Sequence, residues 1–244
     1  MKIIGLIPAR LNSSRLPNKP LLNLDGLPLI IHTYKRSSFS KQLDDLAVCT
    51  DSLEIKKIVE DHGGKCFMTS ENHKNGTERI AEIAKDLNFD FIVDIQGDEP
   101  FIDSDHIDRV IDFHKQYNQF DIVVPHLNIV SPESPNIVKL IVDNKNTVRF
   151  MSRSIVPYPF IQKPEFYKKH LSIISFTKKS LQKFSELDVS GLEKIESIEL
   201  MRAIENNFSV GSFAIDGDSF SIDVKEDFDK ASKLMPNDNI RKLY

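Results

Sequence analysis

The sequence contains few cysteines and no long apolar run, and each shortage excludes a class of protein. Its two cysteines, Cys49 and Cys66, are not spaced as metal ligands or as a disulfide framework, so we expect both to be reduced core thiols. No apolar run reaches the roughly 18 residues of a membrane-spanning helix, and the N-terminus lacks the basic-then-apolar pattern of a signal peptide. We therefore expect a cytoplasmic protein.

The sequence also lacks an excess of positive charge. A net charge of −4 at pH 7 argues against a general nucleic-acid or membrane-surface binder, because such proteins usually carry a basic excess. Neither the glycine-rich phosphate loop G-x-x-x-x-G-K-S/T nor the dinucleotide fingerprint G-x-G-x-x-G occurs. Any binding site for an anion must therefore be a local cluster of positive charge, and it must be built from a different motif.

What the chain does contain is a regular alternation of strand and helix patterns. Its 244 residues, 40% of them hydrophobic, can bury a full core. Continuous apolar runs predict strands covered on both faces, at 2–9, 45–50, 65–69, 89–96 and 121–127. Helical patterns lie at 52–64, with Ser52 as N-cap, and at 77–87 and 103–117, with His114 expected on the helix surface. This alternation predicts an α/β fold with a mostly parallel, doubly wound sheet.

The pattern changes after about residue 130. Strand patterns at 137–143, 147–154 and 170–178 precede one long helix at 192–207 and a last strand at 209–216. We expect a smaller mixed-sheet lobe at about 130–210 within a single domain spanning 1–244. The tail from 235 to 244 is expected to be loosely ordered.

Polar residues that follow strands are the first candidates for a site, because ligands of such sheets bind beyond the carboxyl ends of the strands. The first predicted strand is followed by Arg10, Arg15 and Lys19, whose charges could neutralise a polyphosphate. Ser13 could add hydroxyl and backbone donors. A solvated charged loop is the alternative, and spacing alone does not decide between the two.

Two carboxylates are candidates for a metal site. Asp98 follows the strand at 89–96 and suits Mg²⁺, which takes one or two protein carboxylates and completes its shell with water and phosphate oxygens. Asp223 is a candidate second ligand, but the same residue could instead cap the helix at 224–231. The residues alone favour the capping role for Asp223.

Several motifs together resemble the CMP-sugar-acid synthetases. In chain order they are IPARLNSSRLPNKPL, CTDSLEI, MTSENHKNGTER, VDIQGDEPFI, SPNIVKLIVD, FMSRSIVPY and SIDVKEDF. QGDEP combined with NGTER is most similar to the branch that acts on 3-deoxy-manno-octulosonate (Kdo), whereas the sialic-acid branch usually differs at QGDEP. The resemblance implies a nucleotidyltransferase that converts CTP and a 3-deoxy-ulosonic acid into a CMP-sugar and pyrophosphate. It also implies a Mg²⁺ cofactor, a homodimer and a role in lipopolysaccharide or capsule synthesis.

The resemblance assigns roles to individual residues. It implies that the triphosphate is held by Arg10, Ser13, Arg15 and Lys19; the cytosine and ribose by Asn75, Gly76, Thr77 and Arg79; Mg²⁺ by Asp98 and Asp223; and the sugar acid by Gln96, Arg153, His170 and Glu199. Catalysis would depend on the three cations and on Asp98.

The chain departs from the family pattern at several positions. Asn75 stands where the family usually has serine, Ile174 replaces a pocket tyrosine, and Leu200 replaces a glutamine. Because two polar pocket positions have become apolar, we expect an acceptor with an altered tail, such as a deoxy, amino or acylamino variant of Kdo.

Three other functions stay open. One is a sialic-acid-type synthetase, and another is a UTP- or GTP-dependent enzyme acting on a sugar 1-phosphate, although the glycine-rich first loop usual for the latter is absent. The third is a non-catalytic paralogue that binds a sugar nucleotide, which the presence of both Asp98 and Asp223 disfavours.

Overall fold

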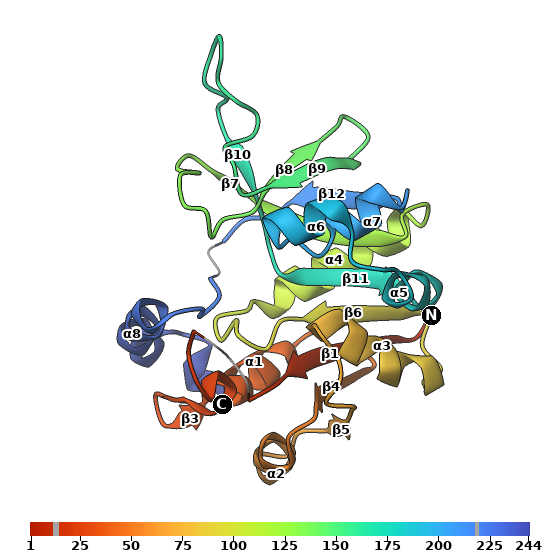
Figure 1. Cartoon of the computed structure of the whole chain (residues 1–244). Coiled ribbons are helices and arrows are strands. Elements are labelled where there is room, and N and C mark those ends of the chain that lie inside the picture. The colour runs from red at the N-terminus through yellow and green to blue at the C-terminus, as the bar shows by residue number, and fades with distance from the viewer. Residues whose placement is uncertain (12–14, 218–219) are drawn as a thin grey trace. The chain divides into compact units, whose positions relative to one another are not determined.

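The computed structural model describes residues 1–11, 15–217 and 220–244. They form two compact units, Met1–Asp108 with Ser219–Tyr244, and Arg109–Asp218. Each unit contains strands and helices of its own (Figure 1). The second unit contains the 130–210 region, whose assignment to sugar binding and dimerisation stays a prediction.

The first unit is built on parallel strands. They are β1 (Ile3–Ala9), β4 (Asp45–Thr50), β5 (Cys66–Met68) and β6 (Phe91–Ile95), in the order β5-β4-β1-β6. β1 pairs in parallel with both β4 and β6, and every residue of β1 is buried, which explains its uninterrupted apolar sequence. The parallel α/β arrangement predicted from the sequence is confirmed, and the carboxyl ends of these strands share one edge.

Helices alternate with these strands. They are α1 (Leu29–Ser37), α2 (Leu53–Asp61), α3 (Gly76–Asp86), α4 (Ser104–Gln116, from Arg109 onward in the second unit) and α8 (Lys225–Leu234). Shorter elements are β2 (Asn23–Leu24), β3 (Leu27–Pro28) and the 3₁₀ turns η1 (Lys19–Leu21), η2 (Met235–Asn237) and η3 (Arg241–Leu243).

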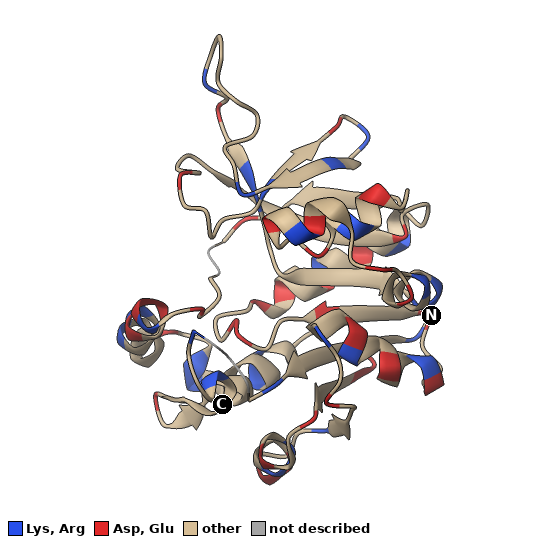
Figure 2. Ribbon diagram, in the orientation of Figure 1, with Lys and Arg blue, Asp and Glu red and all other residues tan. Residues whose placement is uncertain are grey.

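Ser52 caps α2 as predicted, since its hydroxyl accepts the backbone N–H of Ile55. α8 carries residues of both charges (Figure 2). Glu226 and Asp227 are in its first turn and Lys233 is in its last, which matches the helix dipole.

Both cysteines are free thiols, as predicted. Cys49 is buried in β4 and Cys66 is half-buried in β5, and burial raises the pKa of the Cys66 thiol to about 11. Among the described residues, no helix is long and apolar enough to cross a membrane.

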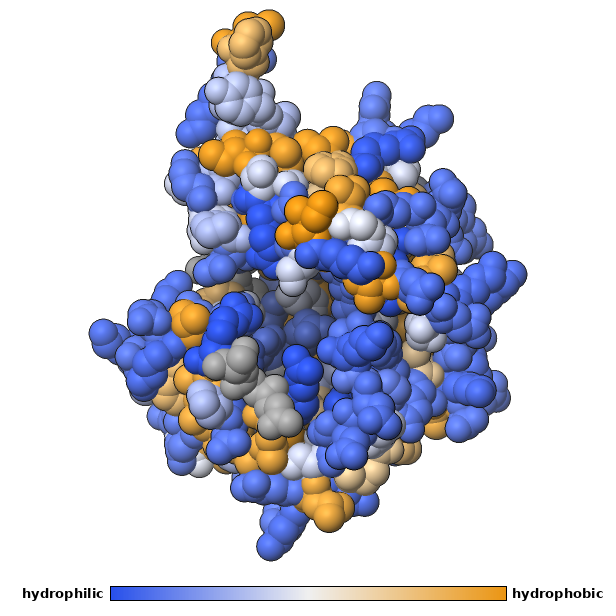
Figure 3. All heavy atoms as spheres, in the orientation of Figure 1, coloured by the Kyte–Doolittle hydropathy of each residue, from blue (hydrophilic) through white to orange (hydrophobic). Residues whose placement is uncertain are grey.

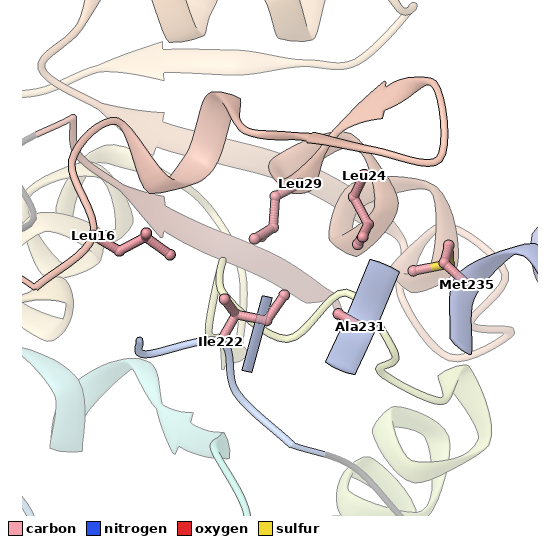
Figure 4. Packing of buried hydrophobic residues seen from close by; sticks show 6 residues of the cluster. All are labelled: Leu16, Leu24, Leu29, Ile222, Ala231 and Met235. Atoms are coloured by element: carbon pink, nitrogen blue, oxygen red, sulfur yellow. The ribbon is translucent and has the colours of Figure 1, made fainter. Parts of the chain in front are cut away.

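A hydrophobic cluster joins the loop after β1 to the C-terminal segment. It consists of Leu16, Leu24, Leu29, Ile222, Ala231 and Met235, all buried (Figure 4). Contrary to expectation, the tail beyond 234 is packed: the Tyr244 hydroxyl lies 2.9 Å from Nδ1 of His32, and Arg36 donates to Asp238 at 2.8 Å. Polar partners far back in the chain hold the tail, and no local pattern reveals them.

The second unit is a mixed sheet, as predicted. Its strands are β7 (Ile122–Ile129), β8 (Lys139–Val142), β9 (Val148–Ser152), β10 (Tyr167–His170), β11 (Ile173–Thr177) and β12 (Val210–Ala214). β7 pairs antiparallel with β10 and β11 and parallel with β12, and β8 pairs antiparallel with β9 and β10. The helices are α5 (Lys178–Ser185), α6 (Gly191–Glu196) and α7 (Met201–Glu205).

Three local predictions for this unit are wrong. The single helix at 192–207 is broken into α6 and α7, because Ser197 adopts a left-handed conformation with φ of 52°. The strand predicted at 170–178 begins too early, because β11 covers only Ile173–Thr177 and His170 is the last residue of β10. His114 is fully buried and bonds to the Ser175 hydroxyl at 2.8 Å and the Phe120 carbonyl at 3.0 Å, so it is not a surface residue.

Two buried histidines predict acid sensitivity. His114 is 0% exposed, and His126, 4% exposed, bonds to the Ser212 hydroxyl at 2.7 Å. Burial lowers the pKa of each from 6.5 to about 4. The unfolded chain therefore binds more protons below pH 6.5, so stability falls as the pH drops from 6.5 towards 4. We expect a loss of about 2 kcal/mol per histidine at pH 5.

Urea unfolding at pH 7.5 and pH 5 measures this loss. The variant His126→Gln should reduce the difference between the two pH values. A free energy of unfolding that stays constant from pH 7.5 to pH 5 would contradict the assignment.

Candidate functional site

The structure brings four predicted site residues into contact. Nζ of Lys19 lies 2.6 Å from Oδ2 of Asp98 and 3.7 Å from Oδ1 of Asp223. Arg15 donates from Nη2 to the same Asp223 oxygen at 2.7 Å. Two cations from the loop after β1 thus meet one carboxylate from the end of β6 and one from the segment before α8.

The hydrophobic cluster holds these charges in place. Its members Leu16 and Ile222 are the direct chain neighbours of Arg15 and Asp223 (Figure 4). The backbone N–H of Ile222 also donates to the carbonyl of Asp98 at 2.9 Å. Side chains separated by up to 208 residues in sequence are thereby fixed beside one another.

Gly97 is required by the close approach of two strand ends. A Cβ at this position would lie 2.8 Å from the Pro8 carbonyl oxygen and 3.0 Å from a methyl of Ile30. The glycine lets the end of β6 pass directly against β1, which places Asp98 at the shared carboxyl edge.

Asp223 does not use its carboxylate as the cap of α8. The backbone N–H groups of Asp223 and Val224 are accepted by Asp227, at 3.0 and 3.1 Å. The carboxylate of Asp223 instead accepts from Arg15 and from the Ser221 hydroxyl at 3.3 Å. The capping interpretation of Asp223 is therefore wrong, and its carboxylate is available to the site.

The predicted nucleoside residues surround the start of α3. Asn75 caps this helix, with Oδ1 accepting the N–H of Glu78 at 2.8 Å, and a Cβ at Gly76 would lie 2.9 Å from Pro8. Thr77 is buried and faces Asp94 at 3.4 Å. These contacts order the loop, while direct contact with a nucleoside stays a prediction.

Arg79 is enclosed and bonded within the first unit. It is 2% exposed and donates to Asp51 at 2.9 Å and to Thr69. Sequence reasoning missed Asp51, although it directly follows β4 and the strand-end rule would have found it. The guanidinium therefore holds the loops after β4 and β5 in place.

The remaining predicted site residues of the first unit are Arg10, Gln96 and Ser13. Arg10 is exposed at the end of β1, and Gln96 donates to Asp94 at 3.0 Å. Ser13 lies outside the described residues.

Three predicted sugar residues of the second unit, Arg153, Glu199 and Leu200, lie around the break between α6 and α7. Arg153 donates to the carbonyls of Glu196 at 2.6 Å, Ser197 at 3.1 Å and Pro135 at 2.9 Å. Glu199 and Leu200 lie between α6 and α7, with Leu200 buried. Arg153 thus anchors the irregular segment that carries Glu199 and Leu200.

His170 has an enclosed polar atom. Its Nδ1 meets no hydrogen-bond partner in the part of the chain that the structure describes. Burial lowers the pKa of His170 to about 4, which keeps the ring neutral at pH 7. Ile174, in the next strand along the chain, β11, is buried.

Comparison with known proteins decides the family. A family model described as cytidylyltransferase matches residues 4–213. The chain belongs to this cytidylyltransferase family. Its resemblance to the CMP-sugar-acid synthetases, inferred from the motifs, is confirmed.

Individual relatives of this cytidylyltransferase cover nearly its whole length. A 3-deoxy-manno-octulosonate cytidylyltransferase of Thermodesulfovibrio yellowstonii is 38% identical, over 96% of this chain and 98% of the relative. An 8-amino-3,8-dideoxy-manno-octulosonate cytidylyltransferase of Shewanella sp. (strain W3-18-1) is 36% identical, over 96% and 99%. The structure of a CMP:2-keto-3-deoxy-manno-octonic acid synthetase complexed with CTP superposes with a TM-score of 0.93 at 30% identity, over 97% and 99% of the two chains.

The carboxylate pair of this cytidylyltransferase fits a divalent cation. Asp98 and Asp223 both lie within 4 Å of a positive charge, the ammonium of Lys19. Within the described ranges, no group of three or more His, Cys, Asp or Glu is placed to hold a metal. A site with two carboxylates suits Mg²⁺ when phosphate oxygens and water supply the other ligands.

Proposed function

We propose that this cytidylyltransferase transfers the cytidylyl group of CTP to the anomeric hydroxyl of a Kdo-like 3-deoxy-ulosonic acid and releases pyrophosphate. The observation that carries the proposal is the convergence of Arg15, Lys19, Asp98 and Asp223 at the carboxyl edge of the parallel sheet. It is supported by full-length relatives named for Kdo and 8-amino-Kdo.

The chain would act mainly by positioning the reactants and stabilising charge. The oxygen of the anomeric hydroxyl attacks the α-phosphorus and gives up its proton to water. The bond from that phosphorus to the bridging oxygen breaks, and its pair of electrons leaves with pyrophosphate. Arg10, Arg15 and Lys19 would bind the triphosphate and stabilise the negative charge that develops on the leaving group. Asp98 and Asp223 would hold Mg²⁺, which supplies further neutralisation of phosphate charge when bound.

The sugar acid would be recognised by residues of the second unit. Buried polar atoms are normally paired, so the enclosed Nδ1 of His170 is suited to a hydrogen bond with a sugar hydroxyl. Because its ring is neutral, one nitrogen can donate and the other can accept. Arg153 and Glu199 would define the rest of this pocket.

We propose an acceptor with an altered tail. Ile174 and Leu200 are apolar and buried, so neither offers a hydrogen bond to a tail hydroxyl. One of the relatives is named for an 8-amino acid. We expect kcat/KM for a tail-modified acid to exceed that for Kdo by about tenfold or more.

A pyrophosphate-release assay with CTP and Mg²⁺ tests both proposals. The panel comprises Kdo, 8-amino-Kdo, an acylamino variant and a sialic acid, with UTP and GTP replacing CTP as nucleotide controls. If Kdo is turned over and kcat/KM is no higher for the modified acids, only the altered-tail proposal is wrong. An absence of turnover with every acid would remove the cytidylyltransferase function itself.

We also propose that the chain forms a homodimer through the loop between β9 and β10. Tyr158, Phe160 and Ile161 in this loop are 77%, 87% and 92% exposed. Hydrophobic atoms gather at the tip of the loop (Figure 3). Burial of such side chains against a second copy would remove apolar surface from water.

Light scattering after gel filtration should give twice the mass of one chain. The double variant Phe160→Ser/Ile161→Ser should elute as a monomer, whereas Leu53→Ser, which changes an exposed apolar residue of α2, should not. A parent protein that is monomeric at micromolar concentration would contradict the dimer.

A further inference from the structure

The carboxylates suited to a metal are occupied by the chain's own cations. Lys19 bonds Asp98 at 2.6 Å and approaches Asp223 at 3.7 Å, and Arg15 bonds Asp223 at 2.7 Å. The Lys19 side chain is only 14% exposed, and those of Asp98 and Asp223 are 25% and 27% exposed. The pairs made by Lys19 are therefore less screened by water than ordinary surface salt bridges, whereas the Arg15 side chain is 58% exposed.

The same groups are required for two other contacts during the proposed reaction. Arg15 and Lys19 would bind phosphates, and Asp98 and Asp223 would bind the divalent cation. An ammonium within 4 Å of both carboxylates repels a second cation at that position. When the triphosphate binds, it offers these two cations a more highly charged partner and leaves the carboxylates free.

The chain next to each of these cations has a buried residue, so side-chain rotation can bring about the change of partner. Leu16, next to Arg15, is buried in the hydrophobic cluster, and Pro20, next to Lys19, is buried at the start of η1. Long lysine and arginine side chains can turn from a carboxylate to a phosphate without moving this frame.

We propose that Arg15 and Lys19 act as internal counter-ions that keep the divalent cation off Asp98 and Asp223 until CTP binds. The inference rests on the proposed function and adds the order in which the ligands bind. CTP binds before the metal or together with it, and the metal does not bind tightly alone. Because coupling between two ligands is reciprocal, a cation bound at the carboxylates also strengthens the binding of CTP by releasing the two basic side chains.

Titration of the CTP-free protein with Mn²⁺, followed by the electron paramagnetic resonance signal of free aqueous Mn²⁺, tests the proposal without turnover. The parent should bind Mn²⁺ weakly. Lys19→Gln, which removes the ammonium, should bind Mn²⁺ roughly tenfold more tightly. Adding Asp98→Asn to Lys19→Gln should abolish that gain. Lys65→Gln is the matched control, because it removes a lysine bonded to Asp45, at the start of β4.

Equal Mn²⁺ affinity in the parent and in Lys19→Gln would overturn the proposal. Arg15 is 58% exposed, so Arg15→Gln provides a second variant that should fold and should show a smaller gain in the same direction. The result is independent of the acceptor assay. If the parent enzyme turns over CTP but Lys19→Gln binds Mn²⁺ no more tightly than the parent, the proposed function stands and only this inference is wrong.

Discussion

Asp98→Asn should lower kcat for pyrophosphate release by about 10²–10³-fold. The side chain keeps its shape but loses the charge that lies 2.6 Å from Lys19 and that would hold Mg²⁺ beside the phosphates. Amide oxygens are weak ligands in comparison, so neutralisation of phosphate charge would be incomplete when the leaving group departs. The assay is steady-state pyrophosphate release at saturating CTP.

The nature of the defect separates a metal ligand from a nucleotide contact. Asp98→Asn should not weaken the binding of CTP measured without metal, because the variant leaves the basic residues in place and frees Lys19 from its carboxylate. Asp229→Asn, which changes an exposed carboxylate of α8, should turn over at the parental rate. Unchanged kcat in Asp98→Asn would show that Asp98 is not a metal ligand.

Arg202→Met should destabilise the protein by about 3–5 kcal/mol. Arg202 is 1% exposed and donates to both carboxylate oxygens of Glu193, at 2.7 and 2.6 Å. It also donates to the Leu187 carbonyl at 3.1 Å, and its guanidinium lies 4.9 Å from the ring centre of Phe184. Methionine fills much of the space but leaves the largely buried carboxylate of Glu193 without its cation.

Urea unfolding at pH 7.5 measures the loss, and a surface ion pair supplies the control. Arg149 is 62% exposed and paired with Asp143 at 2.6 Å, so Arg149→Met should change stability by less than about 1 kcal/mol. Arg202→Met/Glu193→Gln should recover part of the loss, because no uncompensated charge then stays buried. Equal effects of Arg202→Met and Arg149→Met would contradict the proposed role of burial.

The parallel part of the fold was predictable because its strands are covered on both faces. β1, β4 and β6 therefore appear in the sequence as continuous apolar runs of the right length. The errors came where distant contacts override a local pattern. A helical period continues through 192–207, yet the left-handed Ser197 breaks the helix and Arg202 ties α7 back to Glu193 in α6.

The candidate site, like the fold, was only partly predictable from the sequence. The position of Asp98 and of the basic loop after a strand follows from the sequence, because parallel strands present their carboxyl ends at one edge. The sequence does not decide whether Asp223 caps α8 or contributes its carboxylate to the site, because an acidic residue just before a helix suits both roles. The hydrophobic cluster that contains both Leu16 and Ile222 decided it, together with the carboxylate of Asp227, which accepts the backbone N–H groups before α8.

The sequence by itself determined an α/β fold, because local apolar patterns record the strands and the loops that follow them. Its short motifs, through their resemblance to the CMP-sugar-acid synthetases, indicated a cytidylyltransferase. The tertiary structure alone decided that Lys19 bonds Asp98 across 79 residues and that Arg15 bonds Asp223 across 208. No local pattern encodes these pairs. Their partners come together only when the hydrophobic cluster closes the C-terminal segment onto the loop after β1.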